Sequence, residues 1–190
     1  LCPPVRQWFK DKFPDFTRPQ KLAIPAIMDK QHLLLCSPTG SGKTLTAFLT
    51  VIDQLVRLAL DRKLEKKVHA IYISPIKALA NDIQRNLIGP LNEITENYLP
   101  DRAQEIRVGL RTGDTSQSDR QKMLRNPPHI LITTPESLAI AITSPRFQPI
   151  VSEVEYMIID ELHSMVSTKR GVHLSLTPVS YTHLRAHETA

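Results

Sequence analysis

The chain has 190 residues, of which 41% are hydrophobic, so it is long enough for one sizeable domain with a short appendage. No apolar run approaches the ~18 residues of a membrane span, and the two cysteines, Cys2 and Cys36, are too few for a disulfide framework or a zinc site. We therefore expect a soluble protein from a reducing compartment. The net charge of +5 is compatible with nucleic-acid binding but does not establish it.

Short apolar segments alternate with helical patterns along the chain. The predicted strands are Leu33–Cys36, Ala70–Ser74, Ile106–Leu110, Ile130–Thr133 and Tyr156–Ile159. The predicted helices are Gly42–Leu60, Ile76–Ile88, Gln117–Leu124 and Glu136–Thr143, with breaks at Pro90, Pro100, Pro127-Pro128 and Pro145. This alternation predicts an α/β fold with a mostly parallel sheet and helices on both faces.

A glycine-containing loop joins the first predicted strand to the first predicted helix. Its glycines let backbone N–H groups point at phosphate oxygens, and the following helix adds the positive end of its dipole. Lys43 is expected to reach the β- and γ-phosphates, and the hydroxyl of Thr44 to hold Mg²⁺. Ser37 replaces the first glycine of the usual pattern, which costs little if that position does not need a positive φ. The predicted nucleotide-binding residues of this loop are Thr39, Gly40, Ser41, Gly42, Lys43 and Thr44.

Two adjacent carboxylates follow the last predicted strand. Ligand sites of parallel α/β sheets lie at the carboxyl ends of the strands, so Asp160 and Glu161 can meet the phosphate loop there. Asp160 suits a Mg²⁺ ligand acting through water, and Glu161 suits the base that activates the attacking water. Alone, Asp-Glu after a strand is a common solvated turn. Together with the upstream loop, the pair predicts an ATPase site whose catalytic residues are Lys43, Asp160 and Glu161.

Taken in order, the motifs resemble those of the first RecA-like domain of a superfamily 2 helicase of the DEAD/DEAH type. Phe16-Thr17-Arg18-Pro19-Gln20 is similar to the Q motif, which implies that Gln20 reads the adenine edge of ATP; an amide has the donor and acceptor for that pairing. Three further segments resemble motifs that line a single-stranded nucleic-acid track in that family. Residues 74–82 resemble motif Ia, residues 111–114 the Thr-Gly-Asp element, and residues 133–137 motif Ib. Their hydroxyls and helix starts suit phosphate contacts that do not read sequence. The implied contact residues are Pro75, Lys77, Arg111, Gly113, Asp114, Thr134, Pro135 and Glu136.

Within the superfamily, the stretch from Val5 to Leu176 is most similar to the large helicase-related proteins. The segments that carry this resemblance are 72–83, 128–138, Asp160-Glu161-Leu162-His163 and 169–176. The resemblance implies an ATP-dependent DNA translocase and helicase of the bacterial or archaeal cytoplasm, often linked to DNA repair. It also implies that His163 couples the nucleotide state to the next motif.

The resemblance further implies parts that this sequence lacks. The family continues into motif III and a second RecA-like domain with an arginine finger, so residues 1–177 are expected to form an ATP-binding domain truncated before motif III.

Residues 178–190 resemble the translation of a sequencing adapter and are expected to be foreign to the fold; a native polar tail is the alternative. The chain begins at Leu1 without a methionine, so it is expected to continue upstream. An isolated half-site is expected to bind ATP weakly and turn it over poorly, because an arginine finger can contribute ~10³–10⁵ in rate.

Other functions remain open at this level. The segment could act as a nucleic-acid-binding module without productive catalysis, or belong to an RNA helicase, in which case RNA would replace single-stranded DNA as the partner. A different phosphate-loop ATPase, such as a transporter engine, is disfavoured by Gln20 upstream of the loop and by the two Ser/Thr-Pro segments. The sequence offers no membrane partner.

Overall fold

The computed structural model describes residues 1–38, 40–75 and 83–161. The chain divides into two compact units, one formed by Leu1–Leu64 and Ala80–Ile106, the other by Glu65–Leu79 and Arg107–Ala190. The expected boundary at residue 177 and the tail 178–190 lie outside the described residues. No helix of the described part is long and apolar enough to cross a membrane.

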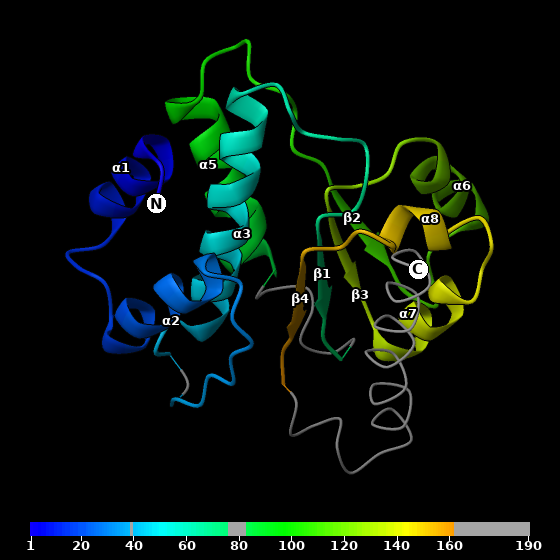
Figure 1. Cartoon of the computed structure of the whole chain (residues 1–190), viewed down its shortest axis with the longest axis horizontal. Helices are drawn as coiled ribbons and strands as arrows, with labels where there is room; N and C mark the ends of the chain where they lie inside the picture. The colour runs from blue at the N-terminus through cyan, green and yellow to red at the C-terminus, as the bar shows by residue number, and fades with distance from the viewer. Residues whose placement is uncertain (39, 76–82, 162–190) are drawn as a thin grey trace. The chain divides into compact units, whose positions relative to one another are not determined.

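The second unit is built on a parallel four-stranded sheet with the order β2-β3-β1-β4 (Figure 1). Its strands are β1 (Ala70–Ile73), β2 (Val108–Arg111), β3 (Ile130–Thr133) and β4 (Tyr156–Ile159). All three ladders are parallel and in step, because Ala70 pairs with both Ile130 and Tyr156, and Val108 pairs with Ile130. The predicted α/β fold with a parallel sheet is confirmed.

Helices cover one face of this sheet. They are α6 (Gln117–Arg125), α7 (Pro135–Ile142) and α8 (Gln148–Val151). The start of α7 follows from its sequence: the Thr134 hydroxyl accepts a hydrogen bond from the backbone N–H of Ser137 (3.3 Å), and Pro135 occupies the first turn, where no N–H is needed. Apolar side chains of the sheet, α7 and the α8 region form one core: Val68, Ile71, Ile73, Leu131, Leu138, Ala141, Ile142, Phe147, Val151 and Val154.

The first unit is helical in the described residues. It contains α1 (Pro3–Lys12), α2 (Arg18–Met28), α3 (Lys43–Leu60), a π-helical turn η2 (Gln84–Ile88) and α5 (Gly89–Tyr98). Helix α3 buries one long apolar face, and the indole N–H of Trp8 on α1 donates to Glu93 on α5 (2.7 Å). The sequence patterns predicted α3 but missed α1, α2, α5 and α8.

One predicted strand is wrong in the described structure. Leu33–Cys36 forms no ladder there, the side chains of Leu33 and Leu34 are 46% and 76% exposed, and Cys36 is exposed rather than buried. An apolar run identifies a segment suited to a sheet, but a strand also needs a hydrogen-bonding neighbour, which the run itself does not specify.

Two further boundaries differ from the sequence prediction. The strand predicted at Ile106–Leu110 is observed at Val108–Arg111, two residues later at its start and one later at its end. Just before it, the carbonyl of Arg107 accepts the N–H of His129 (2.8 Å), at the amino ends of β2 and β3. The predicted break at Pro90 does not occur: η2 continues into α5. Proline has no N–H to donate, and in the preceding turn the N–H of Gly89 bonds to Gln84 five residues back. Residues 76–82 of the helix predicted at Ile76–Ile88 lie outside the described part.

A row of polar side chains crosses the sheet at the amino ends of the strands. Arg107, His129, His69 and Glu155 directly precede β2, β3, β1 and β4, which is their spatial order. Nδ1 of His129 accepts the backbone N–H of Arg107 (3.0 Å), and Nδ1 of His69 faces Glu155 (3.4 Å). Burial, with the positive charges of Arg107 and His69 adding to it, lowers the pKa of His129 to about 4.

This depressed pKa predicts that acid destabilises the second unit. The ordinary pKa of histidine is near 6.5, so between that pH and about 4 the unfolded chain binds a proton that the folded chain does not, and stability falls as pH falls through this window. From about pH 7 to pH 4, His129→Gln should lose ~1–3 kcal/mol less unfolding free energy than the unaltered chain. Urea titrations at several pH values measure this difference. Parallel pH profiles for the two proteins would show that His129 does not titrate on unfolding.

Candidate functional site

The loop before α3 has the backbone shape expected of a phosphate loop. Gly40 and Gly42 have φ values of 79° and 84°, in the left-handed region that side chains disfavour. Ser37 is not among the residues with positive φ, so its place in the pattern needs no glycine. Thr39 lies outside the described residues.

The loop is held closed by its own side chains. The ammonium group of Lys43 donates to the carbonyls of Ser37 and Pro38, the latter at 2.8 Å. The hydroxyls of Ser37 and Ser41 lie 2.6 Å apart. Lys43 and Thr44 lie in the first turn of α3, where the positive end of the helix dipole favours an anion. A phosphate bound here would replace carbonyl partners of Lys43 with charged oxygens.

Gln20 contacts this loop from α2. It is 3% exposed, and its side-chain oxygen accepts the backbone N–H of Thr17 (2.9 Å), while its own N–H donates to the Thr17 hydroxyl (3.4 Å) in a capping box. A Cβ built on Gly42 would lie 2.8 Å from Nε2 of Gln20. Thr17 also donates to the carbonyl of Ser41 (3.1 Å). The segment predicted to read adenine therefore packs on the phosphate loop.

The carboxylate pair lies where β4 ends. The backbone N–H of Asp160 donates to the carbonyl of Ile73 (2.9 Å), so hydrogen bonding to β1 extends to Asp160. Oδ1 of Asp160 accepts the N–H of Glu161 (2.8 Å), and Oδ2 accepts the hydroxyl of Tyr72 (2.7 Å). Glu161 has a φ of 53°, which few residues other than glycine adopt, so the chain turns sharply after Asp160.

The three predicted nucleic-acid loops leave the same edge of the sheet. Ser74 follows β1, Thr112 follows β2 and Thr134 follows β3, all at the carboxyl ends. Hydrogen bonds join them: the N–H of Ser74 donates to the carbonyl of Thr133 (3.2 Å), and the Thr133 hydroxyl donates to the carbonyl of Arg111 (2.8 Å). Asp160 and Glu161 share this edge, so the second unit brings one half of the predicted ATP site beside the predicted track.

The side chains predicted to contact nucleic acid differ in their accessibility. Gly113 and Asp114 are exposed, and Pro75 and Glu136 are partly exposed, whereas Pro135 is buried. Thr134 is 2% exposed and its hydroxyl caps α7. Arg111 is 8% exposed, and its guanidinium lies 4.4 Å from the ring centroid of Phe147. Lys77 and His163 lie outside the described residues.

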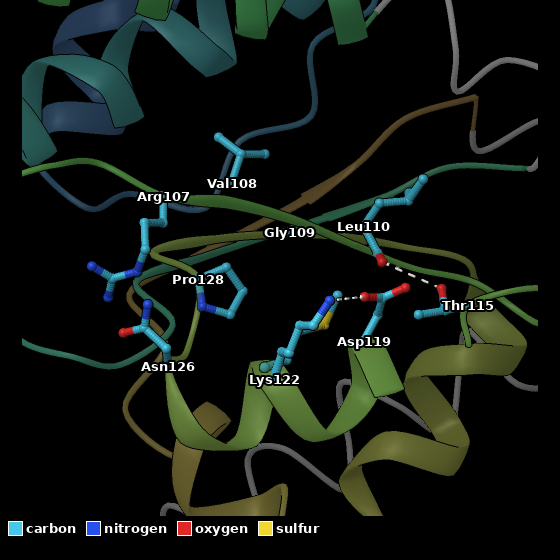
Figure 2. Close-up of a pocket in the computed structure, with 10 residues that line it drawn as sticks. Arg107, Val108, Gly109, Leu110, Thr115, Asp119, Lys122, Asn126 and Pro128 are labelled. Atoms are coloured by element: carbon cyan, nitrogen blue, oxygen red, sulfur yellow. Dashed lines mark hydrogen bonds and ion pairs between the residues drawn. The ribbon is translucent and has the colours of Figure 1, made fainter. Parts of the chain in front are cut away.

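A groove along the outer edge of β2 was not predicted from the sequence. Its volume is about 470 Å³, and Figure 2 shows α6 below it, with Lys122 paired to Asp119 at 3.0 Å. Gly109 allows Pro128 to pack closely against β2, because a Cβ at Gly109 would lie 2.7 Å from the proline side chain. The groove begins next to the turn formed by 112–115, but its mixed lining shows no periodicity that could have revealed it in the sequence. The lining residues include Arg107, Leu110, Thr115, Asn126 and Pro128.

The oxygen groups of the predicted metal site suit Mg²⁺. Mg²⁺ prefers one or two carboxylates together with hydroxyls, phosphates and waters over an all-protein cage. Asp160 offers a carboxylate that is held by the hydroxyl of Tyr72 and the backbone N–H of Glu161, and Thr44 offers a hydroxyl. The described residues contain no cluster of three or more His, Cys, Asp or Glu side chains that would favour a different metal.

Comparison with known proteins identifies the family. The sequence model of the DEAD/DEAH box helicase family matches residues 17–181. The chain belongs to this family. The match begins within the Q-motif segment, at Thr17, and includes Gln20, the phosphate loop, strands β1 to β4 and the carboxylate pair.

Named relatives narrow the resemblance. The chain is 52% identical over 176 residues to the ATP-dependent helicase Lhr-Core of Methanocaldococcus jannaschii, covering 92% of this chain and 21% of that protein. It is 45% identical to the Lhr helicase/uracil glycosylase of Escherichia coli, covering 93% of this chain and 12% of that protein. The chain thus spans only about a fifth or less of these relatives.

A solved relative has the same fold. The structure of the Mycobacterium smegmatis helicase Lhr bound to single-stranded DNA and AMP-PNP superposes with a TM-score of 0.83 at 41% identity, covering 96% of this chain and 23% of that protein. The first domain of an Lhr-type ATP-dependent helicase is therefore the part of the family architecture that this chain represents.

The contact between Gln20 and the phosphate loop predicts unequal effects of two glycine substitutions. Gly40→Ala and Gly42→Ala both force alanine into the left-handed region, at a cost of about 1–2 kcal/mol each. Only Gly42→Ala also places a Cβ against Gln20, whereas a Cβ on Gly40 meets nothing within 4 Å. Displacing Gln20 breaks the capping box, so Gly42→Ala should cost roughly 1 kcal/mol more than Gly40→Ala in urea unfolding. Equal costs would show that Gln20 moves aside freely.

Proposed function

We propose that this chain is the ATP-binding domain of an ATP-dependent DNA helicase or translocase, which hydrolyses ATP with Mg²⁺ while it holds a single nucleic-acid strand. The observation that carries this proposal is the shared carboxyl edge of the sheet. There, β4 delivers Asp160 and Glu161, and the neighbouring β1, β3 and β2 deliver the three loops predicted to contact nucleic acid. Hydrogen bonds between the strand ends link the two sets of residues.

The ATP half of the proposal assigns one role to each group. Backbone N–H groups of Gly40 to Gly42 and the start of α3 bind phosphate oxygens, and Lys43 neutralises their charge. Thr44 and Asp160 would hold Mg²⁺, which supplies charge neutralisation at the phosphates when bound. Glu161 accepts the proton of the attacking water. Gln20, through its contact with Gly42, connects recognition of the base to the shape of the loop.

The nucleic-acid half divides the predicted residues by accessibility. A nucleic-acid strand can reach the exposed turn at Gly113 and Asp114 and the partly exposed Pro75 and Glu136. Lys77 adds a positive charge to the loop after β1. Arg111, Thr134 and Pro135 are buried, so we assign them to holding these loops rather than to direct phosphate contact. The DNA-bound and AMP-PNP-bound Lhr relative supports DNA as the strand and ATP as the nucleotide.

The rest of the activity belongs to parts outside this chain. We propose that a second RecA-like domain completes the ATP site, that His163 relays the nucleotide state, and that residues 178–190 contribute nothing to either. The relatives come from archaea and bacteria. We therefore propose that this protein acts on DNA in the cytoplasm of such a cell.

Substitutions at Lys43 and Glu161 should separate ATP binding from hydrolysis in the full-length protein. Lys43→Ala removes a charged hydrogen-bond donor to the phosphates and should weaken nucleotide binding by roughly 10- to 100-fold. Glu161→Gln keeps the size of the side chain but not its basicity, so binding should stay within about twofold while turnover falls by ~10²–10⁴. Nucleotide fluorescence titrations and phosphate-release assays measure the two quantities. Unchanged turnover in Glu161→Gln would refute the assignment of Glu161 as the base.

A further inference from the structure

Strand β1 is apolar except for one side-chain hydroxyl, that of Tyr72. Its sequence is Ala70-Ile71-Tyr72-Ile73, and Tyr72 is only 2% exposed, so its phenolic hydroxyl needs a partner within the protein. The hydroxyl donates to Oδ2 of Asp160 at 2.7 Å. A buried tyrosine therefore makes a direct hydrogen bond to the carboxylate assigned to Mg²⁺.

The parallel register explains this contact. Tyr72 pairs with Ile158 across the β1–β4 ladder, and Asp160 lies two residues beyond Ile158 on the same face of the sheet. Diagonal neighbours at this spacing are within reach of an aromatic side chain. The alternate residues Ile71 and Ile73 point to the opposite face, into the core formed with α7 and the α8 region. Moving the tyrosine by one position along β1 would lose the contact.

The hydrogen bond completes a clamp on Asp160. Oδ2 accepts from Tyr72 and Oδ1 accepts from the backbone N–H of Glu161, so each carboxylate oxygen has a donor within 2.8 Å. Fixing both oxygens sets the plane of the carboxylate, and a carboxylate oxygen can accept a metal or water contact in addition to one hydrogen bond. Groups that orient metal ligands in this way commonly change metal affinity when removed.

We propose that Tyr72 is a positioning residue that holds the Asp160 carboxylate in its metal-binding orientation. This inference rests on the proposed ATPase function, in which Asp160 holds Mg²⁺. Strand β1, which leads into the first predicted nucleic-acid loop, would then have a second role in the ATP site. Ser74 begins that loop two residues after Tyr72, so the same strand end supports both sites.

The test is the affinity of the full-length protein for Mn²⁺, a paramagnetic substitute for Mg²⁺, in the presence of AMP-PNP. Tyr72→Phe removes only the hydroxyl and should weaken Mn²⁺ binding by roughly tenfold, measured by electron paramagnetic resonance titration. AMP-PNP binding without metal should stay unchanged, because the phosphate loop is untouched. Far-ultraviolet circular dichroism and the thermal midpoint establish that each variant is folded.

Tyr98→Phe is the matched control. The hydroxyl of Tyr98 also donates to an aspartate, Asp11, at 2.6 Å, but that pair lies on the exposed surface of the other unit. Its removal should leave Mn²⁺ affinity unchanged. An equal loss in both variants would overturn the proposal, because the effect would then not depend on Asp160.

Asp160→Asn separates failure of the inference from failure of the proposed function. If Asp160→Asn weakens Mn²⁺ binding and a folded Tyr72→Phe does not, Tyr72 is structural only and the inference is wrong. If Asp160→Asn leaves Mn²⁺ affinity unchanged, the metal assignment itself fails, and the inference fails with it.

Discussion

The in-step register of four parallel strands is the constraint on which the rest of the second unit depends. Parallel ladders place the carboxyl ends of β2, β3, β1 and β4 side by side, so residues separated by up to about ninety positions in the chain meet at one edge. A slip of one residue in the β1–β4 ladder would turn Asp160 to the other face and separate it from Tyr72. The chemistry at this edge therefore depends on backbone hydrogen bonds several residues away.

The two ends of the sheet use polar side chains differently. At the amino ends, Arg107, His129, His69 and Glu155 bond largely to one another and to backbone, and burial depresses the pKa of His129. At the carboxyl ends, the hydroxyls of Thr133 and Thr134 join neighbouring loops and cap a helix. These bonds fix the loops in place and leave the turn at Gly113 exposed. A rigid edge that supports accessible turns is suited to gripping a strand through its backbone.

Much of this arrangement could be predicted from sequence because its signals are local. The strands at 130–133 and 156–159 carry their own apolar residues, and the positive φ of Gly40 and Gly42 follows from loop chemistry. Information that depends on a partner was not available locally. The exposure of Leu33 and Leu34, the stacking of Arg111 on Phe147 and the bond between Tyr72 and Asp160 all depend on residues distant in the chain. The sequence therefore indicated candidate residues for the site, but not which of them are buried.

We propose that Asp160, Glu161 and the loops after β1, β2 and β3 act together in ATP hydrolysis and DNA binding because they share one edge of the sheet. The most direct test is ATP turnover by the full-length protein with and without saturating single-stranded DNA, with Mg²⁺ and ATP in excess. The shared edge predicts that DNA raises turnover several-fold, since DNA bound to the loops after β1, β2 and β3 contacts the same sheet edge that carries Asp160. Equal turnover in both conditions, with DNA binding verified in the same samples, would contradict the claim and show that the two sites work independently.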